Sequence, residues 1–471
     1  MTEINNQLIN LTELNQYITG NSTEIMEYLP QNVEPFLDLI ITSPPYWDMK
    51  KYGNVEQTGY NQTYEEYLND IQETFEVIYR LSKDTATLYV NSDTIKRDGR
   101  IIRLPDDIAT RLENIGWIHK DVIIWDKGKT LPWSRKGQMR NTFEYIHMFV
   151  KSENYKYYIE RIKTVDELKE WWVDYPERYS PEGKVPDNIW PFTIPTQGSW
   201  GTKMDFGDKE FRHACPFPPE MMARMIKLSS DEGDVVFDPY AGTGILLATA
   251  EKLNRKYLGF DTNPEYKEIF EHVTKPLIEE QIKDINNYYE HQERLKMLLN
   301  EAIYKLRILK VPKAMIKAFN KKQNTNYPFI GALAIEEQFN EDDRKKNKIG
   351  KASYYFISNP SSNEIEDPYS ILKEMSEKAP FSKYGLILNI HVISVEEAIE
   401  LIEEQQQTLY LYGNAVVNDS LGEITYEEFR NVIQNEIYNE KYNYKGIPPI
   451  ISNVSITLSD YNEILPDKYK K

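Results

Sequence analysis

The stretch VVFDPYAGTG, residues 235–244, decides the fold of this 471-residue chain. Its apolar beginning predicts a buried strand, and Gly242 and Gly244 follow where that strand ends. Glycines at this point permit a tight turn and let the backbone approach a ligand closely. The spacing of apolar residues after Gly244 predicts a helix. A strand, a glycine turn and a helix in this order indicate an α/β fold.

A second predicted strand, residues 257–260, ends in Asp261, which lies 23 residues after Asp238. A carboxylate at this spacing can accept hydrogen bonds from both ribose hydroxyls of a nucleoside. The turn has no third glycine of a GxGxxG pattern and no Walker lysine, so a nucleoside without a pyrophosphate fits it better than a triphosphate. Standing alone, the turn is equally compatible with a strand-to-helix connection that binds nothing.

A second motif follows the predicted strand 37–42 and consists of Ser43, Pro44, Pro45 and Tyr46. The prolines stop the strand and prevent a helix, so the loop is stiff and stands at the carboxyl end of a strand. Its carbonyls and hydroxyl can accept the N–H groups of an exocyclic base amine, and its aromatic ring can stack on a base that has left the duplex. A rigid proline turn with ordinary aromatic packing is the alternative for this motif alone.

Together, TSPPYW (residues 42–47) and FDPYAGTG (residues 237–244) resemble the signature motifs of the amino-group DNA methyltransferases, in the order of the β class. The resemblance covers about residues 15–270. It implies a Rossmann-like sheet, S-adenosylmethionine as the cofactor, base flipping and direct methyl transfer to the amine. It also implies that Ser43, Pro44, Pro45 and Tyr46 are catalytic. The cofactor-binding residues that it implies are Asn21, Phe217, Asp238, Pro239, Ala241, Gly242, Thr243, Gly244 and Asp261.

Ser43 in the first position of the catalytic motif resembles the cytosine-N4 enzymes, whereas aspartate is commoner there in adenine-N6 enzymes. We therefore expect an N4-cytosine methyltransferase, with N6-adenine as the alternative. Two positions depart from the family pattern: Asn21 stands where an acid is frequent, and Cys215 where a small residue is usual. Because Cys215 does not follow a proline, it lacks the setting of a cytosine-C5 nucleophile.

The partner that the resemblance implies is double-stranded DNA. A net charge of −18 argues against nonspecific coating of nucleic acid, but a local basic loop can still reach phosphates. Such a loop separates the predicted strands 122–125 and 145–150. Its candidate DNA-binding residues are Lys127, Lys129, Arg135, Lys136 and Arg140. A solvated loop without DNA contact is the alternative.

The alternation of strands with helices, such as the helix predicted over 64–81, indicates an α/β methyltransferase sheet. Residues 1–150 form the first part of this catalytic domain, and residues 213–272 form the second part, with the cofactor motif. The aromatic- and proline-rich residues 151–212 are expected to be an inserted target recognition region. A linking helix over 273–310 and a separate C-terminal α/β accessory domain over 311–471 complete the predicted organisation.

Composition limits the remaining choices. A single cysteine excludes a disulfide framework, and the scattered histidines show no metal-binding spacing, so we expect no metal. No run of 18 apolar residues occurs, and we expect a cytoplasmic protein without a membrane partner. A homodimer, and a partner restriction endonuclease or defence-system subunit, stay open. The competing functions are a bifunctional enzyme that also cuts DNA through residues 311–471, and an inactive DNA-binding or assembly subunit.

Overall fold

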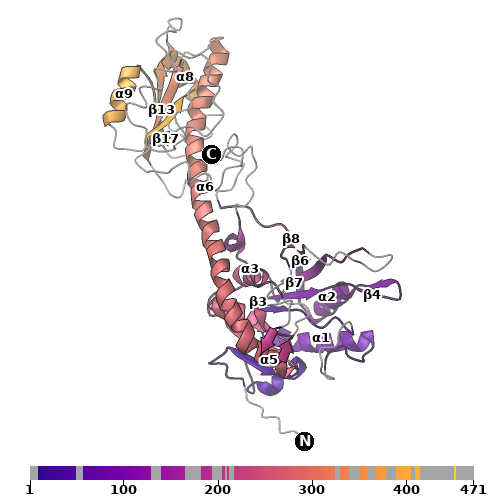
Figure 1. The fold of residues 1–471 in the computed structure, drawn as a ribbon. Helices are drawn as coiled ribbons and strands as arrows, with labels where there is room; N and C mark the ends of the chain where they lie inside the picture. The colour runs from indigo at the N-terminus through magenta and orange to yellow at the C-terminus, as the bar shows by residue number, and fades with distance from the viewer. Residues whose placement is uncertain are drawn as a thin grey trace. The chain divides into compact units, whose positions relative to one another are not determined.

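The computed structural model of the protein describes residues 9–48, 57–128, 139–164, 182–193, 204–206, 209–211, 217–323, 329–338, 351–358, 367–377, 389–404, 409–413 and 450–451. The chain divides into two compact units, shown with the chain's colours in Figure 1. The first unit comprises residues 1–163 and 185–290, and the second comprises residues 164–184 and 291–471.

The first unit is built on an eight-stranded sheet with the order β1-β12-β11-β2-β3-β7-β6-β8. The five strands from β1 to β3 in this order are parallel, β7 is antiparallel to β3 and β6, and β8 is parallel to β6. The strand bounds are β1 Gln16–Thr19, β2 Leu37–Thr42, β3 Ser82–Ser92, β6 Ile118–Asp126, β7 Phe143–Val150, β8 Ile189–Pro191, β11 Val235–Asp238 and β12 Lys256–Asp261.

Helices cover both faces of this sheet. Apolar side chains of η1 (Ser22–Tyr28), α1 (Tyr64–Leu81) and α2 (Leu104–Ile115) form one buried cluster with the strands. Those of α3 (Pro219–Ser229), α4 (Ile245–Lys252) and the beginning of α6 (Lys275–Gln323) form a second cluster. A largely parallel sheet between two helical layers confirms the predicted Rossmann-like α/β fold.

Short elements connect the larger ones. They are β4 (Ile95–Arg97), β5 (Arg100–Ile102), η2 (Ile159–Ile162), β9 (Met204–Phe206), β10 (Lys209–Phe211), α5 (Pro264–Ile269) and the π-helical turn η5 (Phe270–Thr274). β4 pairs with β5, and β9 with β10, as two-stranded hairpins.

The strand β2 and the helix α1 have the bounds that the sequence predicts, because both carry strong local signals. All six residues of β2 are buried, as expected for a central strand of a parallel sheet. α1 begins with a capping box, in which Thr63 accepts from the backbone of Glu66 and the Glu66 carboxylate accepts from the backbone of Thr63. Its apolar stripe, which includes Tyr67, Ile71 and Phe75, is buried against the sheet.

The direction of the strands determines where a site can form. β2, β3, β11 and β12 are parallel and end at one edge of the sheet. β7 is antiparallel to β3 and β6, so its first residues lie at that same edge beside the last residues of both. Polar groups from six strands or their following loops can therefore meet there.

Asp38 joins three strands at the opposite edge. Its carboxylate is buried and accepts from the backbone N–H of Val235 over 3.0 Å. It also accepts from Lys83 Nζ over 2.8 Å. β2, β3 and β11 are thereby tied together where they begin.

The second unit contains a five-stranded sheet with the order β15-β14-β13-β16-β17. β14 is parallel to β15 and antiparallel to β13, which is also antiparallel to β16. The bounds are β13 Phe329–Gln338, β14 Lys351–Ser358, α8 Pro368–Ser376, β15 Asn389–Ile393, α9 Val395–Glu404, β16 Leu409–Gly413 and β17 Ile450–Ile451. Strands mixed with helices confirm the predicted α/β class of this part. The helix predicted over 273–310 is present as α6 and continues to Gln323.

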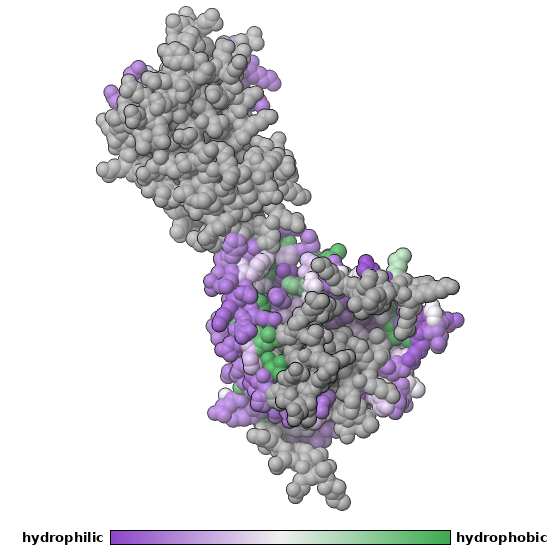
Figure 2. All heavy atoms as spheres, viewed as in Figure 1, coloured by the Kyte–Doolittle hydropathy of each residue, from purple (hydrophilic) through white to green (hydrophobic). Residues whose placement is uncertain are grey.

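None of the helices in the described ranges has both the length and the apolar composition that a bilayer-spanning helix requires. On the face drawn in Figure 2, hydrophilic residues cover most of the described surface of the first unit, and apolar residues form small areas.

We expect Asp38→Ala to lower the free energy of unfolding by about 1–3 kcal/mol, because it leaves the buried N–H of Val235 without an acceptor. Urea unfolding measures this change. Asp84→Ala removes an exposed carboxylate from β3 and should change stability by less than about 0.5 kcal/mol. Equal effects of the two substitutions would show that the Asp38 contacts do not contribute.

Candidate active site

A pocket of about 320 Å³ opens at the edge where the parallel strands of the first unit end. The residues that line it include most of the two predicted motifs: Ser43, Pro44, Pro45, Tyr46, Asp238, Pro239, Ala241, Gly242, Thr243 and Asp261. Asn21, Phe217 and Lys127 line it as well. Gly244 follows as the N-cap of α4. The structure thus brings the two motifs together in one pocket, while the role of each residue stays a prediction.

A hydrogen bond between Thr42 and Asp238 joins the strands that carry the motifs. Thr42 Oγ1 donates to Asp238 Oδ1 over 2.6 Å, and both side chains are buried. β2 and β11 are neighbouring parallel strands, so the loops that follow them start side by side. Ligands held by these two loops would therefore lie in contact.

The glycine turn after β11 packs tightly against its surroundings. Gly244 has a φ of +75°, and a Cβ there would lie 2.3 Å from the ring of Phe270, so a larger residue does not fit. The N–H of Gly242 donates to Asp261 Oδ2 over 3.0 Å, and its carbonyl accepts from the Tyr17 hydroxyl over 2.6 Å. The backbone of Asn263 donates to Asp261 Oδ1 over 2.9 Å. Asp261 is thus held at the pocket wall, and each of its oxygens has lone pairs for further donors.

Burial raises the pKa of both acids on this side of the pocket. The pKa of Asp238 is raised to about 7, mainly because burial disfavours its charged form and further because Asp261 repels it. Burial also raises the pKa of Asp261 to about 6. A ligand that donates hydrogen bonds or brings positive charge to these carboxylates would favour their ionised forms.

Backbone contacts hold the loop after β2 in a sharp bend. The N–H of Trp47 donates to the Pro45 carbonyl over 2.9 Å, and Trp47 has a φ of +49°. A Cβ on Gly59 would lie 2.6 Å from the Trp47 carbonyl oxygen, so glycine is required for this close approach. Within the described residues, no group donates to the carbonyl of Pro44, which leaves this oxygen for a ligand.

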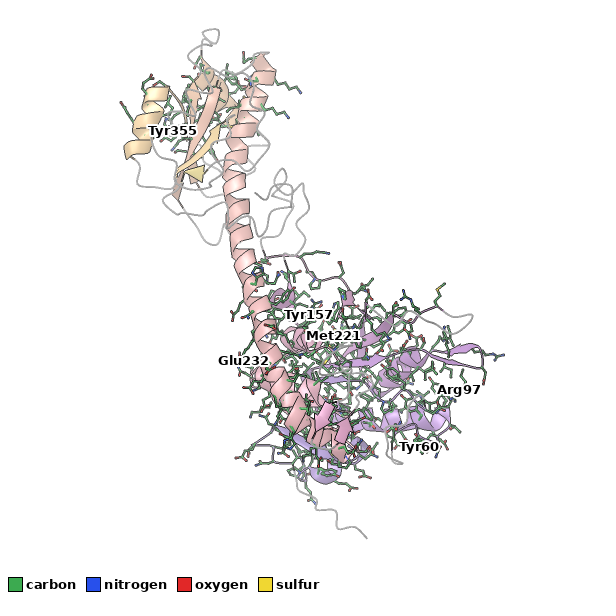
Figure 3. The ribbon with its side chains drawn as sticks, in the orientation of Figure 1. Tyr60, Arg97, Tyr157, Met221, Glu232 and Tyr355 are labelled. Atoms are coloured by element: carbon green, nitrogen blue, oxygen red, sulfur yellow. The ribbon has the colours of Figure 1, made fainter. Side chains whose placement is uncertain are left out.

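The β4–β5 hairpin reaches the same loop through Arg97, which Figure 3 labels at the outer end of the hairpin. Arg97 Nη2 donates to Asp48 Oδ2 over 2.6 Å. Its guanidinium carbon lies 4.2 Å from the ring centroid of Trp47, within the range of a cation–π contact. This hairpin was not among the predicted elements, although the Asp98-Gly99 pair is a recognised hairpin turn signal.

The hydroxyl of Tyr46 is the centre of a hydrogen-bond cluster in the pocket. It accepts from Ser43 Oγ over 3.3 Å and from Asn91 Nδ2 over 2.9 Å, and it donates to Glu144 Oε2 over 2.9 Å. Asn91 Nδ2 also donates to Glu144 Oε2 over 2.7 Å. Burial, and then the charge of Glu144, raises the pKa of Tyr46 well above its usual value, so this hydroxyl keeps its hydrogen.

Lys127 belongs to this cluster, which differs from its predicted contact with DNA phosphates. Its side chain is buried, and Nζ donates to Glu144 Oε1 over 3.0 Å. The physical reason is that a buried carboxylate requires a positive partner, and Lys127 lies two residues after Trp125, which pairs with Glu144 on β7.

The other predicted residues differ in their surroundings, and some of them lie outside the described ranges. Asn21 caps η1, because its Oδ1 accepts from the backbone of Thr23 over 3.1 Å. Phe217 packs beside Trp125, with ring centroids 6.1 Å apart, and Arg140 is exposed. The residues that lie outside the described ranges are Lys129, Arg135, Lys136 and Cys215.

The polar residues of the pocket that were missing from the sequence prediction include Asn91, Asp93, Asn141 and Glu144. Asn141 donates to the Asp93 side chain, and burial raises the pKa of Asp93. Each residue lies near the end of β3 or the beginning of β7. Their position at strand ends is a usable signal only once the antiparallel pairing of these strands is known.

Two family models match the chain. The model described as DNA methylase matches residues 37–272, which are 236 of the 471 residues. The model described as D12 class N6 adenine-specific DNA methyltransferase matches residues 222–356.

Known proteins match between 52% and 59% of the chain. Type II methyltransferase M.XycI of Xanthomonas campestris pv. cyanopsidis is 26% identical over 277 residues, which are 52% of this chain and 83% of the relative. Type II methyltransferase M.Cfr9I of Citrobacter freundii is 26% identical over 280 residues, 53% of this chain and 84% of the relative. The solved PvuII DNA methyltransferase (cytosine-N4-specific) is 20% identical, with a TM-score of 0.42, and the match covers 59% of this chain and 94% of that chain.

We expect Asp238→Asn to stabilise the folded protein more at pH 8 than at pH 5. The pKa of this carboxyl is about 7 in the folded parent and about 4 in the unfolded chain. The folded state therefore binds more protons between these values, and the parent loses stability as the pH rises through them. Asparagine cannot ionise and keeps an oxygen for Thr42.

Thermal unfolding of parent and variant in the two buffers measures this effect. The Tm difference between variant and parent should grow with pH, while the exposed control Asp84→Asn should show none. A difference that is the same at both pH values would contradict the raised pKa of Asp238.

Proposed function

The chain belongs to the DNA methylase family, and from this premise we propose that it transfers a methyl group from S-adenosylmethionine to the N4 amine of cytosine within a specific sequence of duplex DNA. The observation that carries the proposal is that the Ser43–Tyr46 loop and the Asp238–Gly244 turn leave neighbouring strands and line one pocket. Two reactants held by these loops would be oriented for direct transfer, and orientation is a large part of the catalysis that such a reaction needs.

The residues of the glycine turn fit S-adenosylmethionine. Asp261 offers carboxylate oxygens at the end of β12 to ribose hydroxyls, and no lysine follows the turn to bind phosphates. Among the described residues no cation pairs with the buried carboxyl of Asp238, which suits the positively charged end of a methionine group. When bound, S-adenosylmethionine supplies a methyl group on a positively charged sulfur, which leaves as a neutral thioether when the amine attacks.

The loop after β2 would hold the amine. We assign its two N–H groups to Ser43 Oγ and the Pro44 carbonyl, because no described group donates to the Pro44 carbonyl, whereas the Pro45 carbonyl already accepts one hydrogen bond from Trp47. Accepting both hydrogens favours a pyramidal nitrogen whose lone pair can attack. Tyr46 would lie beside a base that has left the duplex.

The choice of cytosine N4 over adenine N6 rests on Ser43. A serine in the first motif position resembles the N4 enzymes, and N6-adenine is the alternative because both bases present the same kind of amine. The D12 model, described as N6 adenine-specific, matches a region that does not include residues 43–46.

Exposed cations near the pocket support contact with a duplex. Arg140 lies before β7, and Lys96 and Arg100 lie on the β4–β5 hairpin that touches the catalytic loop through Arg97. We propose these residues as phosphate contacts. We also propose residues 151–212 for target recognition and a restriction or related defence system as the biological setting.

Incubation of the parent protein with methyl-labelled S-adenosylmethionine should transfer label to duplex DNA that contains one short sequence. Digestion of the product to nucleosides should give N4-methylcytosine. If the digest contains N6-methyladenine in place of N4-methylcytosine, the target is adenine N6, the alternative, and the cytosine assignment is wrong. Label in RNA but in no duplex DNA of varied sequence would show that the substrate assignment is wrong.

Asp261→Asn should weaken the binding of S-adenosylmethionine about tenfold, or about 1.4 kcal/mol, because a charged acceptor for the ribose is lost. Isothermal titration calorimetry measures the Kd. Glu265→Gln, which neutralises an exposed acid just after β12, is the matched control and should leave the Kd unchanged. An unchanged Kd for Asp261→Asn would remove this residue from the binding site.

A further inference from the structure

We infer that Glu144, paired with Lys127, acts through the Tyr46 hydroxyl to keep Ser43 as a hydrogen-bond acceptor for the target amine. This inference rests on the proposed function. It gives Glu144 and Lys127 a positioning role, exerted through Tyr46, in the reaction at Ser43.

The first step concerns the charge of Glu144. Three donors converge on its carboxylate: Lys127 Nζ at 3.0 Å, Asn91 Nδ2 at 2.7 Å and the Tyr46 hydroxyl at 2.9 Å. Glu144 and Lys127 are both buried, so each needs the charge of the other. A carboxylate surrounded by donors is anionic, and an anionic carboxylate can only accept hydrogen bonds.

The second step fixes the hydrogens at Tyr46. A tyrosine hydroxyl has one hydrogen and two lone pairs. Its hydrogen must go to Glu144, which can only accept. Asn91 reaches both Tyr46 and Glu144 with the same nitrogen, which can only donate, so one lone pair of Tyr46 is taken. The remaining lone pair faces Ser43 Oγ at 3.3 Å.

The third step follows for Ser43. Because Tyr46 has no hydrogen left to give, Ser43 must donate its own to Tyr46, and the lone pairs of Ser43 Oγ stay available to the pocket. A serine without this constraint can turn its hydrogen towards the amine nitrogen and occupy the electron pair that must attack. The buried Glu144–Lys127 pair therefore makes the Ser43 hydroxyl act as a hydrogen-bond acceptor towards the amine, as a carboxylate would in the same place.

A double-mutant cycle on kcat tests the inference. Tyr46→Phe removes the hydroxyl and keeps the ring, and we expect kcat to fall about tenfold, equivalent to about 1.4 kcal/mol, with unchanged KM for DNA and for S-adenosylmethionine. In a Ser43→Ala background the same substitution should change kcat less than about twofold, because the hydroxyl acts through Ser43. Equal losses in both backgrounds, or a raised KM in place of a lower kcat, would overturn the inference.

A second cycle keeps Ser43 in every variant. Glu144→Gln should lower kcat about as much as Tyr46→Phe, and the double variant should be no slower than either single one. Additive losses would overturn the inference. Tyr89→Phe is the matched control, because it removes another buried tyrosine hydroxyl. This hydroxyl is hydrogen-bonded to Ser229 Oγ at 2.7 Å and does not line the pocket, so the substitution should leave kcat unchanged.

A neutron structure of the parent protein tests the hydrogen positions without any activity. Deuterium on Ser43 Oγ directed at Tyr46, and on Tyr46 directed at Glu144, is the expected result. Deuterium on Tyr46 directed at Ser43 would overturn the inference. If the parent methylates no nucleic acid, the proposed function fails by itself, and this measurement still decides the hydrogen-bond direction.

Discussion

The hydrogen bond from Thr42 to Asp238 is the contact on which the geometry of the site depends. It links the last residues of two central parallel strands, β2 and β11, and so determines the separation of the loops that follow. A buried carboxyl is costly to the fold, because burial disfavours its charged form and raises the pKa of Asp238 to about 7. In the proposed function this lower stability would accompany an acid placed to contact a bound ligand, as is often found at functional sites.

The parts that the sequence could predict are those whose causes are local. The bounds of β2 follow from an apolar run that ends at two prolines, and those of α1 from a cap and a stripe of apolar residues. The glycine turn is equally local, since Gly244 needs a left-handed backbone and space beside Phe270. These segments contain both predicted motifs, so the α/β class and about half of the residues that line the pocket could be predicted before any pairing of strands was known.

The parts that could not be predicted depend on pairing between distant segments. Lys127 follows β6 in a run of basic residues and was expected to contact DNA. The pairing of β6 with β7 brings Glu144 within reach of it, and the buried ion pair decides the direction of the lysine side chain. The same pairing brings Asn91 and Glu144 to Tyr46. No spacing in the sequence reveals this cluster, because Tyr46 and Glu144 are 98 residues apart and meet only when β7 lies antiparallel to β3.

The cluster around Tyr46 also constrains how this protein can evolve. An aspartate at position 43 would place a second carboxylate within reach of the single hydrogen of Tyr46, which Glu144 already holds. Like charges so close together in a buried site are unfavourable. An exchange of Ser43 for aspartate is therefore favourable only after position 46 or 144 has changed, so the order of the substitutions matters. The effect of a substitution at position 43 therefore depends on which residues stand at positions 46 and 144.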